Sequence, residues 1–130
     1  MNVLLSIKPK YVDEILSGAK KYEFRRVSFR KSVETIYIYC NSSVKRVFGS
    51  FTMGGIPEGT PEEIWNLCHQ YGGITGAALF KYFKNASKAY AIKIRNSHRF
   101  DAPIDPSTVL PDFSPPQSFR YIPLWSPARE

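Results

Sequence analysis

Two spacings of apolar residues run along the chain and predict a succession of strands and helices. Alternating positions rich in β-branched and aromatic residues indicate strands, and apolar positions three or four residues apart indicate helices. A charged strand is predicted directly after Gly18. The other predicted strands cover residues 3–7, 33–40, 44–53 and 88–94, and the predicted helices cover residues 9–17, 61–71 and about 76–84.

Particular residues mark the ends of these elements. Pro9 stands in the first turn of a helix, where its missing N–H costs nothing, and Gly18 is typical of a helix end. Thr60-Pro61-Glu62-Glu63 is a capping box, which predicts a helix start. Gly49, inside a predicted strand, indicates a bulge or a close approach of two backbones.

The composition changes at Phe100, because seven of the ten prolines lie between residues 103 and 127. We predict that this tail is extended and has no further regular structure. Its aromatic residues predict that it packs on the rest of the chain: Phe113, Phe119, Tyr121 and Trp125. The chain, residues 1–130, is thus predicted to be a single α+β domain with a Pro-rich extension over residues 101–130. About five or six mostly antiparallel strands and two or three helices are expected.

The composition limits the class of protein to which the chain can belong. With 43% hydrophobic residues, the chain can bury a core. No apolar run approaches the roughly 20 residues of a membrane span, and the apolar start is too short for a signal peptide. Cys40 and Cys68 are interpreted as reduced core thiols of a cytoplasmic protein. There is no C-x-x-C, and His69 and His98 are isolated, so neither a metal site nor a cofactor is predicted.

The net charge of +7 favours a polyanionic partner. Residues 20–31 hold six cations against one carboxylate, Glu23, which gives this segment a charge of +5. In a strand, Glu23 and Arg25 share one face, with Lys21 beside them, and Tyr22 and Phe24 share the other. The segment is either an anion-binding site or a solvated face with a ladder of ion pairs.

The order of these residues resembles a known family. Ser6-Ile7-Lys8-Pro9, followed by Gly18-Ala-Lys-Lys-Tyr-Glu-Phe-Arg25, resembles the ASCH domain of the PUA-like superfamily, with its strand, helix and G-x-K-x-x-E-x-R motif. The resemblance covers about residues 3–94 and extends to residues 115–120. It implies a β-barrel-like fold and a basic cleft beside the first helix. It also implies that this cleft binds RNA or a nucleotide, in a regulator of transcription or translation.

One branch of the family implies an alternative function. Small bacterial members resemble amidohydrolases that act on N4-acetylcytidine, with a Lys in the Gly-x-Lys position and a Thr three residues later. Lys20 matches the Lys, but Glu23 stands in place of the Thr and cannot supply a hydroxyl nucleophile. Lys20 and Glu23 are the catalytic candidates if the chain is an enzyme. We predict binding rather than hydrolysis.

The candidate binding residues follow from their chemistry. Lys20 and Arg25 can neutralise phosphate, and Arg25 can do so with a bidentate fork. Glu23 either holds these cations in place or accepts a hydrogen bond from a base edge, such as the amino group of cytosine or adenine. Three aromatic residues could stack on a base or instead pack in the core or the tail: Tyr39, Phe119 and Tyr121. The predicted nucleic-acid-binding residues are Ser6, Lys8, Lys20, Glu23, Arg25, Arg26, Tyr39, Ser43, Gln117, Ser118 and Arg120.

The expected partner is therefore RNA or a nucleotide, with DNA as an alternative and no membrane. The sequence leaves the ligand and the oligomeric state open. A protein-interaction role for the Pro-rich tail ranks last, because the tail lacks a P-x-x-P array with basic flanks.

Overall fold

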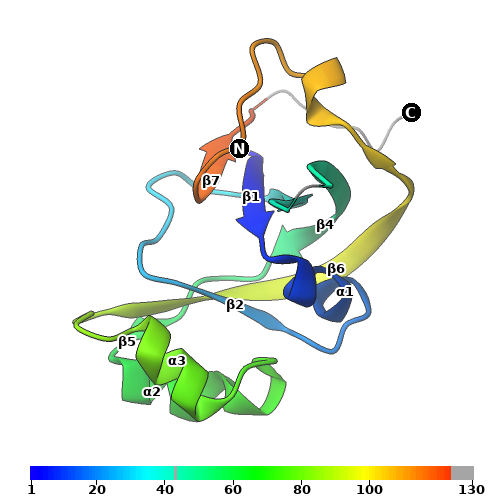
Figure 1. Cartoon of the computed structure of the whole chain (residues 1–130). Helices are drawn as coiled ribbons and strands as arrows, with labels where there is room; N and C mark the ends of the chain where they lie inside the picture. Colours follow the sequence, from blue (N-terminus) through cyan, green and yellow to red (C-terminus); the bar gives the residue numbers. More distant parts are fainter. Residues whose placement is uncertain (43, 124–130) are drawn as a thin grey trace.

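The computed structural model describes residues 1–42 and 44–123. These residues form one mixed sheet that curls into a half-barrel with three helices (Figure 1), so the predicted α+β, barrel-like fold class is confirmed. The strands are β1 (Val3–Ile7), β2 (Tyr22–Arg25), β3 (Thr35–Cys40), β4 (Arg46–Met53), β5 (Glu58–Gly59), β6 (Ala89–Ile104) and β7 (Phe119–Tyr121). The helices are α1 (Pro9–Leu16), α2 (Pro61–Cys68) and α3 (Gly76–Tyr82), with short 3-10 turns η1 (His69–Tyr71) and η2 (Pro106–Thr108).

The strand order is β2-β6-β4-β3-β1-β7, and the two-residue β5 pairs with β6. Only the β1–β3 pair is parallel among the described strands, and the other pairs are antiparallel. The long β6 pairs with β4 and β2, and so it carries β2 at the end of the sheet. This topology brings the charged strand β2 close to α2 and α3, although α2 begins 36 residues and α3 begins 51 residues after Arg25.

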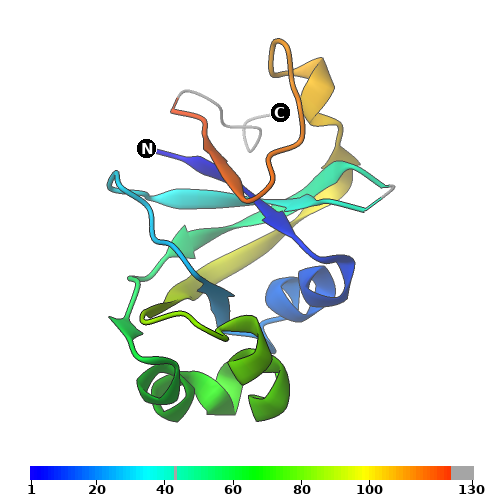
Figure 2. The same cartoon turned by 60° about the vertical axis from the view of Figure 1, so that its left-hand side comes forward.

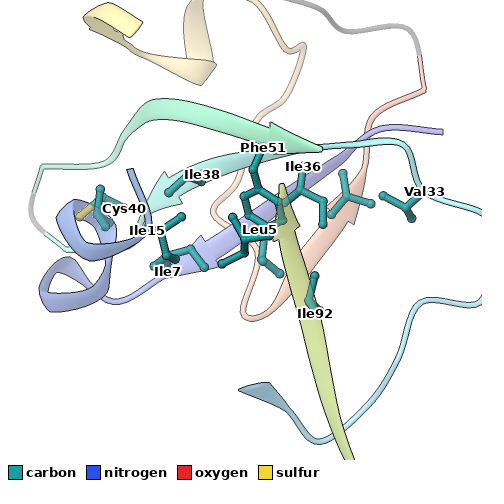
Figure 3. Packing of buried hydrophobic residues seen from close by; sticks show 12 residues of the cluster. Leu5, Ile7, Ile15, Val33, Ile36, Ile38, Cys40, Phe51 and Ile92 are labelled. Atoms are coloured by element: carbon teal, nitrogen blue, oxygen red, sulfur yellow. The ribbon is translucent and has the colours of Figure 1, made fainter. Parts of the chain in front are cut away.

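The main core lies between one face of the sheet and α1. Leu5 and Ile7 of β1 meet Ile36 of β3, Phe51 of β4 and Ile15 of α1 (Figure 3), and all five are at most 1% exposed. A second cluster joins α2 and α3 to β2 and β6. These two helices lie together at the end of the molecule opposite η2 and β7 (Figures 1 and 2). Within the described residues, no helix has the length and apolar character that crossing a bilayer requires.

The predicted helix starts are confirmed, whereas α2 ends earlier than predicted, at Cys68, where the 3-10 turn η1 follows it, and α3 ends at Tyr82. Pro9 is the first residue of α1, and Gly18, just after that helix, has φ +87°, a conformation that glycine adopts without strain. In the capping box, the backbone N–H of Glu63 donates to Thr60 Oγ1 at 3.2 Å, and the Glu63 carboxylate accepts from the Thr60 N–H at 2.9 Å. Cys40 and Cys68 are buried free thiols, as predicted, and burial raises the pKa of Cys68 to about 11.

Gly49 lies at the irregular point predicted for it. The register of β4 shifts beside Gly49 on both neighbouring strands. A Cβ atom at this position would lie 2.2 Å from the backbone oxygen of His98 and 2.8 Å from a methyl group of Leu16. The residue therefore has to be glycine for β4 to pass this close to β6.

Two predictions about secondary structure are wrong in part. The charged strand starts later than predicted, at Tyr22, because the N–H groups of Lys20 and Lys21 donate to Glu14 and Tyr71 rather than to a strand. The segment after Phe100 has further regular structure: β6 continues to Ile104, and β7 pairs with β1.

The aromatic residues of the tail contact the sheet and its loops. The ring of Phe113 lies 5.6 Å from that of Tyr39, and the ring of Phe119 lies 4.8 Å from that of Phe29. Trp125, for which the same packing was predicted, falls outside the described residues.

Candidate functional site

A pocket of about 590 Å³ opens beside the start of α1. Its walls come from the last residues of β1, the first turn of α1, β2, α3 and the tail. This volume is typical of sites that bind small molecules. The residues that line it are Ser6, Lys8, Lys10, Tyr11, Glu23, Phe24, Arg25, Asn41, Ile74, Ala78, Lys81, Tyr82 and Gln117.

The charged wall of the pocket is an ion pair on β2. The Nη2 atom of Arg25 donates to Oε2 of Glu23 at 2.8 Å, and both side chains are mostly buried. The pair forms because residues two apart on a strand point to the same face. Arg25 also donates to the backbone oxygen of Ser6 at 2.6 Å and to the Ser118 hydroxyl at 3.3 Å. The sequence left an anion site and an ion-pair ladder as alternatives, and here the ion pair lies within the pocket wall.

Lys20 lies behind this wall and does not line the pocket. Its side chain is 1% exposed, and its ammonium donates to the backbone oxygen of Gly72. It lies 4.6 Å from the ring centre of Tyr11, 5.0 Å from that of Phe24 and 4.0 Å from Oε1 of Glu23. Burial lowers the pKa of Lys20, while the Glu23 and Glu14 carboxylates act against this shift. Lys20 therefore supports Glu23 from inside the protein.

The tail reaches the pocket because it is hydrogen-bonded to the end of β1. The N–H of Ser6 donates to the oxygen of Ser118 at 2.9 Å, and the Ser6 hydroxyl donates to the oxygen of Pro116 at 2.7 Å. These bonds bring Gln117 to the pocket and Ser118 to Arg25. Residues more than ninety positions apart in the sequence thus share one site.

The predicted binding residues divide into two groups. Those that line the pocket are Ser6, Lys8, Glu23, Arg25 and Gln117. The others lie elsewhere, apart from Ser43, which falls outside the described residues. The Arg26 guanidinium donates to the backbone oxygens of Tyr82 and Lys84, and Arg120 lies on β7, where it pairs with Leu4 of β1.

The basic run over residues 20–31 does not form one continuous face. Lys20 is buried, Lys21 lies 4.9 Å from the ring centre of Tyr71, and Lys31 lies 5.1 Å from that of Tyr121. Arg25 is the one member of this run that lines the pocket. The exposed cations at the pocket are Lys8, Lys10 and Lys81, which belong to other elements.

Sequence reasoning missed the aromatic side of the pocket. Tyr11 and Tyr82 line it from α1 and α3, whereas the predicted stacking residues Phe119 and Tyr121 do not. Burial raises the pKa of Tyr82, so its phenol is neutral at physiological pH. Tyr11 could have been found from its position three residues after Lys8. Nothing in the sequence near Tyr82 indicates that α3 borders this pocket.

Tyr39 lies in a second, smaller pocket of about 260 Å³ with Lys45, Arg46, Asp105 and Ser107. Its side chain is fully buried, and its hydroxyl has no hydrogen-bond partner among the described residues. Burial, followed by the nearby Asp105 carboxylate, raises the pKa of Tyr39, so the phenol keeps its proton at neutral pH. The described part of the chain holds no group of three His, Cys, Asp or Glu residues that could bind a metal ion.

Comparisons with known proteins identify the family of the chain. No protein-family model matches it. An ASCH domain-containing ribonuclease from Zymomonas mobilis is 28% identical over 123 residues, which are 92% of this chain and 82% of that protein. The crystal structure of ASCH from Zymomonas mobilis has a TM-score of 0.86 at 26% identity, over 93% of this chain and 87% of that one. The chain is an ASCH domain protein.

Further matches include two variant structures and a second protein. Crystal structures of a Tyr-to-Phe and a Ser-to-Ala variant of the Zymomonas mobilis ASCH protein have TM-scores of 0.86 and 0.85 over 93% of this chain. An ATP synthase subunit alpha from Ureaplasma parvum is 23% identical over 104 residues, but these are 13% of its length.

The motif of this ASCH domain has a local structural explanation. Gly18 ends α1 with a positive φ, Lys20 is buried behind the pocket, and Glu23 and Arg25 form the ion pair in its wall. The motif therefore builds the rigid side of the pocket, and other segments supply the exposed cations.

Proposed function

We propose that this ASCH domain binds single-stranded RNA, with one nucleotide in the pocket beside α1. The observation that carries the proposal is the composition of the pocket: exposed Lys8, Lys10 and Lys81 line it together with a mostly buried Glu23–Arg25 pair. Lysines at the rim can neutralise phosphates, and a recessed polar group can read a base. The name of the Zymomonas mobilis relative, a ribonuclease, supports RNA as the polymer.

Arg25 has a supporting role in this proposal. Its guanidinium already donates to Glu23, to Ser6 and to Ser118, so it holds β2, β1 and the tail together. The rim lysines are the groups left to contact phosphate. The amidohydrolase alternative lacks support, because Lys20, its catalytic candidate, does not line the pocket and already donates to the backbone oxygen of Gly72. Binding of a transcript would allow the regulatory role that the family resemblance implies.

The binding experiment is a fluorescence anisotropy titration with a labelled single-stranded oligoribonucleotide at several salt concentrations. Affinity is expected to fall steeply with salt, because each neutralised phosphate releases counterions and contributes a slope of about −0.7 in log K against log salt. The same sequence as DNA serves as the comparison, since the pocket is proposed to prefer RNA. Binding that does not depend on salt, or no binding to RNA, would contradict the proposal.

A second candidate function is cleavage of the bound strand, and the unpaired Tyr39 hydroxyl favours it. The two pockets are neighbours along the chain. Asn41 and Gln117 line the first pocket, and Tyr39 and Pro115, two residues before them, line the second. Residues two apart in an extended chain are about 7 Å apart, so one RNA strand can reach both pockets. Cleavage would proceed by attack of a ribose 2′-hydroxyl of the strand on the adjacent phosphate, which breaks the bond to the 5′-oxygen of the next nucleotide, with water taking up and supplying the protons. In the second pocket, the protonated Tyr39 phenol would donate to a phosphate oxygen, and Lys45 and Arg46 would neutralise charge that develops in this step.

Tyr39→Phe is expected to reduce cleavage of single-stranded RNA by about 10²-fold, because a donor to the transition state is lost. The variant should be at least as stable as the wild type, since the hydroxyl has no partner among the described residues to lose. Cleavage is measured with an oligoribonucleotide labelled at both ends, and stability by thermal unfolding. Tyr37→Phe, on the same face of β3 and outside both pockets, is the control and should cleave normally. Equal cleavage by all three proteins would contradict the role of Tyr39.

A further inference from the structure

We infer that the pocket selects cytosine or adenine, and that Glu23 recognises the exocyclic amino group of these two bases. The inference rests on the RNA-binding function proposed above and adds its base preference. The observation behind it is a carboxylate that lines the pocket with one of its two oxygens uncommitted.

The two oxygens of Glu23 differ in their surroundings. Oε2 accepts the hydrogen bond from Arg25 at 2.8 Å. Oε1 lies 4.0 Å from the Lys20 ammonium, which is beyond hydrogen-bond distance, and no hydrogen bond from the described residues reaches it. The carboxylate is held between two cations and is 9% exposed, so little side-chain freedom is lost when a ligand binds. Glu23 lines the pocket, and Oε1 is the oxygen of its carboxylate that is left to accept a hydrogen bond from a ligand.

A single fixed acceptor distinguishes the four bases. Cytosine and adenine each present an amino group that can donate to Oε1. Uracil presents one N–H between two carbonyl oxygens, and both oxygens are repelled by a carboxylate. Guanine also has an amino group, but a ring N–H lies next to it, and this pair of donors is best matched by both oxygens of a carboxylate, of which Oε2 is already bound to Arg25. The geometry thus favours cytosine and adenine.

The other residues of the pocket suit the body of a base. Tyr11 and Tyr82 line the pocket from α1 and α3 and provide aromatic surfaces on which a base can stack. Lys8 and Lys10 lie at the start of α1, close to the rim, where a phosphate attached to the nucleotide would remain in solvent. The recessed carboxylate and the exposed lysines thus fit the two ends of one nucleotide.

The test compares matched oligoribonucleotides with the wild-type protein. Oligocytidine and oligouridine differ by an amino group in place of a carbonyl, and oligoadenosine and oligoinosine differ in the same way. Oligocytidine is expected to bind about tenfold more tightly than oligouridine, and oligoadenosine about tenfold more tightly than oligoinosine. Equal affinity within both pairs would overturn the inference and leave RNA binding intact. No binding to any of the four would overturn the proposed function itself.

Glu23→Gln tests whether Glu23 is the group that recognises the base. An amide can turn either its oxygen or its NH₂ toward the base, so the ratio within each pair is expected to fall to about 1–2. Glu14→Gln removes the same charge from an exposed residue outside the pocket and should keep the tenfold ratio. A ratio that is unchanged in Glu23→Gln would assign the preference to another residue and overturn the inference. The wild-type comparison decides the base preference even if Glu23→Gln does not fold.

Discussion

Glu23→Ala is expected to lower the free energy of unfolding by about 3–5 kcal/mol, because it leaves two buried cations without their shared carboxylate. Lys20 and Arg25 are 1% and 14% exposed, and Glu23 is the acid that both approach. Without it, their positive charges repel each other in a region that excludes water. Urea unfolding followed by circular dichroism measures the change, under conditions where the wild type unfolds in a single transition.

The control is an ion pair on the surface. Glu58 and Lys88 are 3.2 Å apart, but their side chains are 53% and 62% exposed. Glu58→Ala is therefore expected to cost about 0–1 kcal/mol. If Glu23→Ala were no more destabilising than Glu58→Ala, the ion pair in the pocket wall would not be the structural support described here.

Replacing Lys8, Lys10 and Lys81 together with alanine is expected to weaken RNA binding by about 10²-fold at 0.1 M salt, because three phosphate contacts are lost. All three side chains are exposed, so the variant should fold with nearly the stability of the wild type. Affinity is measured by fluorescence anisotropy with the same oligoribonucleotide as for the wild type.

The matched control replaces Lys21, Lys31 and Lys88, which are exposed and lie outside the pocket lining. Either triple variant loses three positive charges, so the net charge falls from +7 to +4 in both. The control should keep most of the wild-type affinity. If both variants lose affinity equally, the general charge of the protein binds RNA, and the pocket does not.

Local signals in the sequence predicted the elements of the fold well. Pro9, Gly18 and the capping box at Thr60 each act on the backbone next to them, so their effect can be derived without the fold. The short strand β7 could not be predicted this way, because its three residues are ordered by pairing with β1, more than a hundred positions earlier. Pairing between strands so far apart in the sequence gives the residues of β7 no local pattern from which the strand could be predicted.

The candidate site was predictable for the residues of the motif but not for their partners. The alternation along β2 was enough to place Glu23 beside Arg25. The run of cations that begins at Lys20 suggested one basic face, but several of its side chains contact different neighbours in the folded chain: Lys20, Lys21, Arg26 and Lys31. Lys81 and Tyr82 reach the pocket because α3 packs against β2, which depends on the whole order of strands.

The central claim, that RNA phosphates lie at the rim of this pocket, is tested most directly by the salt dependence of binding. We expect the slope of log K against log salt to be about 2 units shallower for the Lys8, Lys10 and Lys81 variant than for the wild type, since each lost phosphate contact removes about 0.7. The Lys21, Lys31 and Lys88 variant should keep the wild-type slope. Equal slopes for the wild type and the pocket variant would contradict the account, because the phosphates would then lie elsewhere.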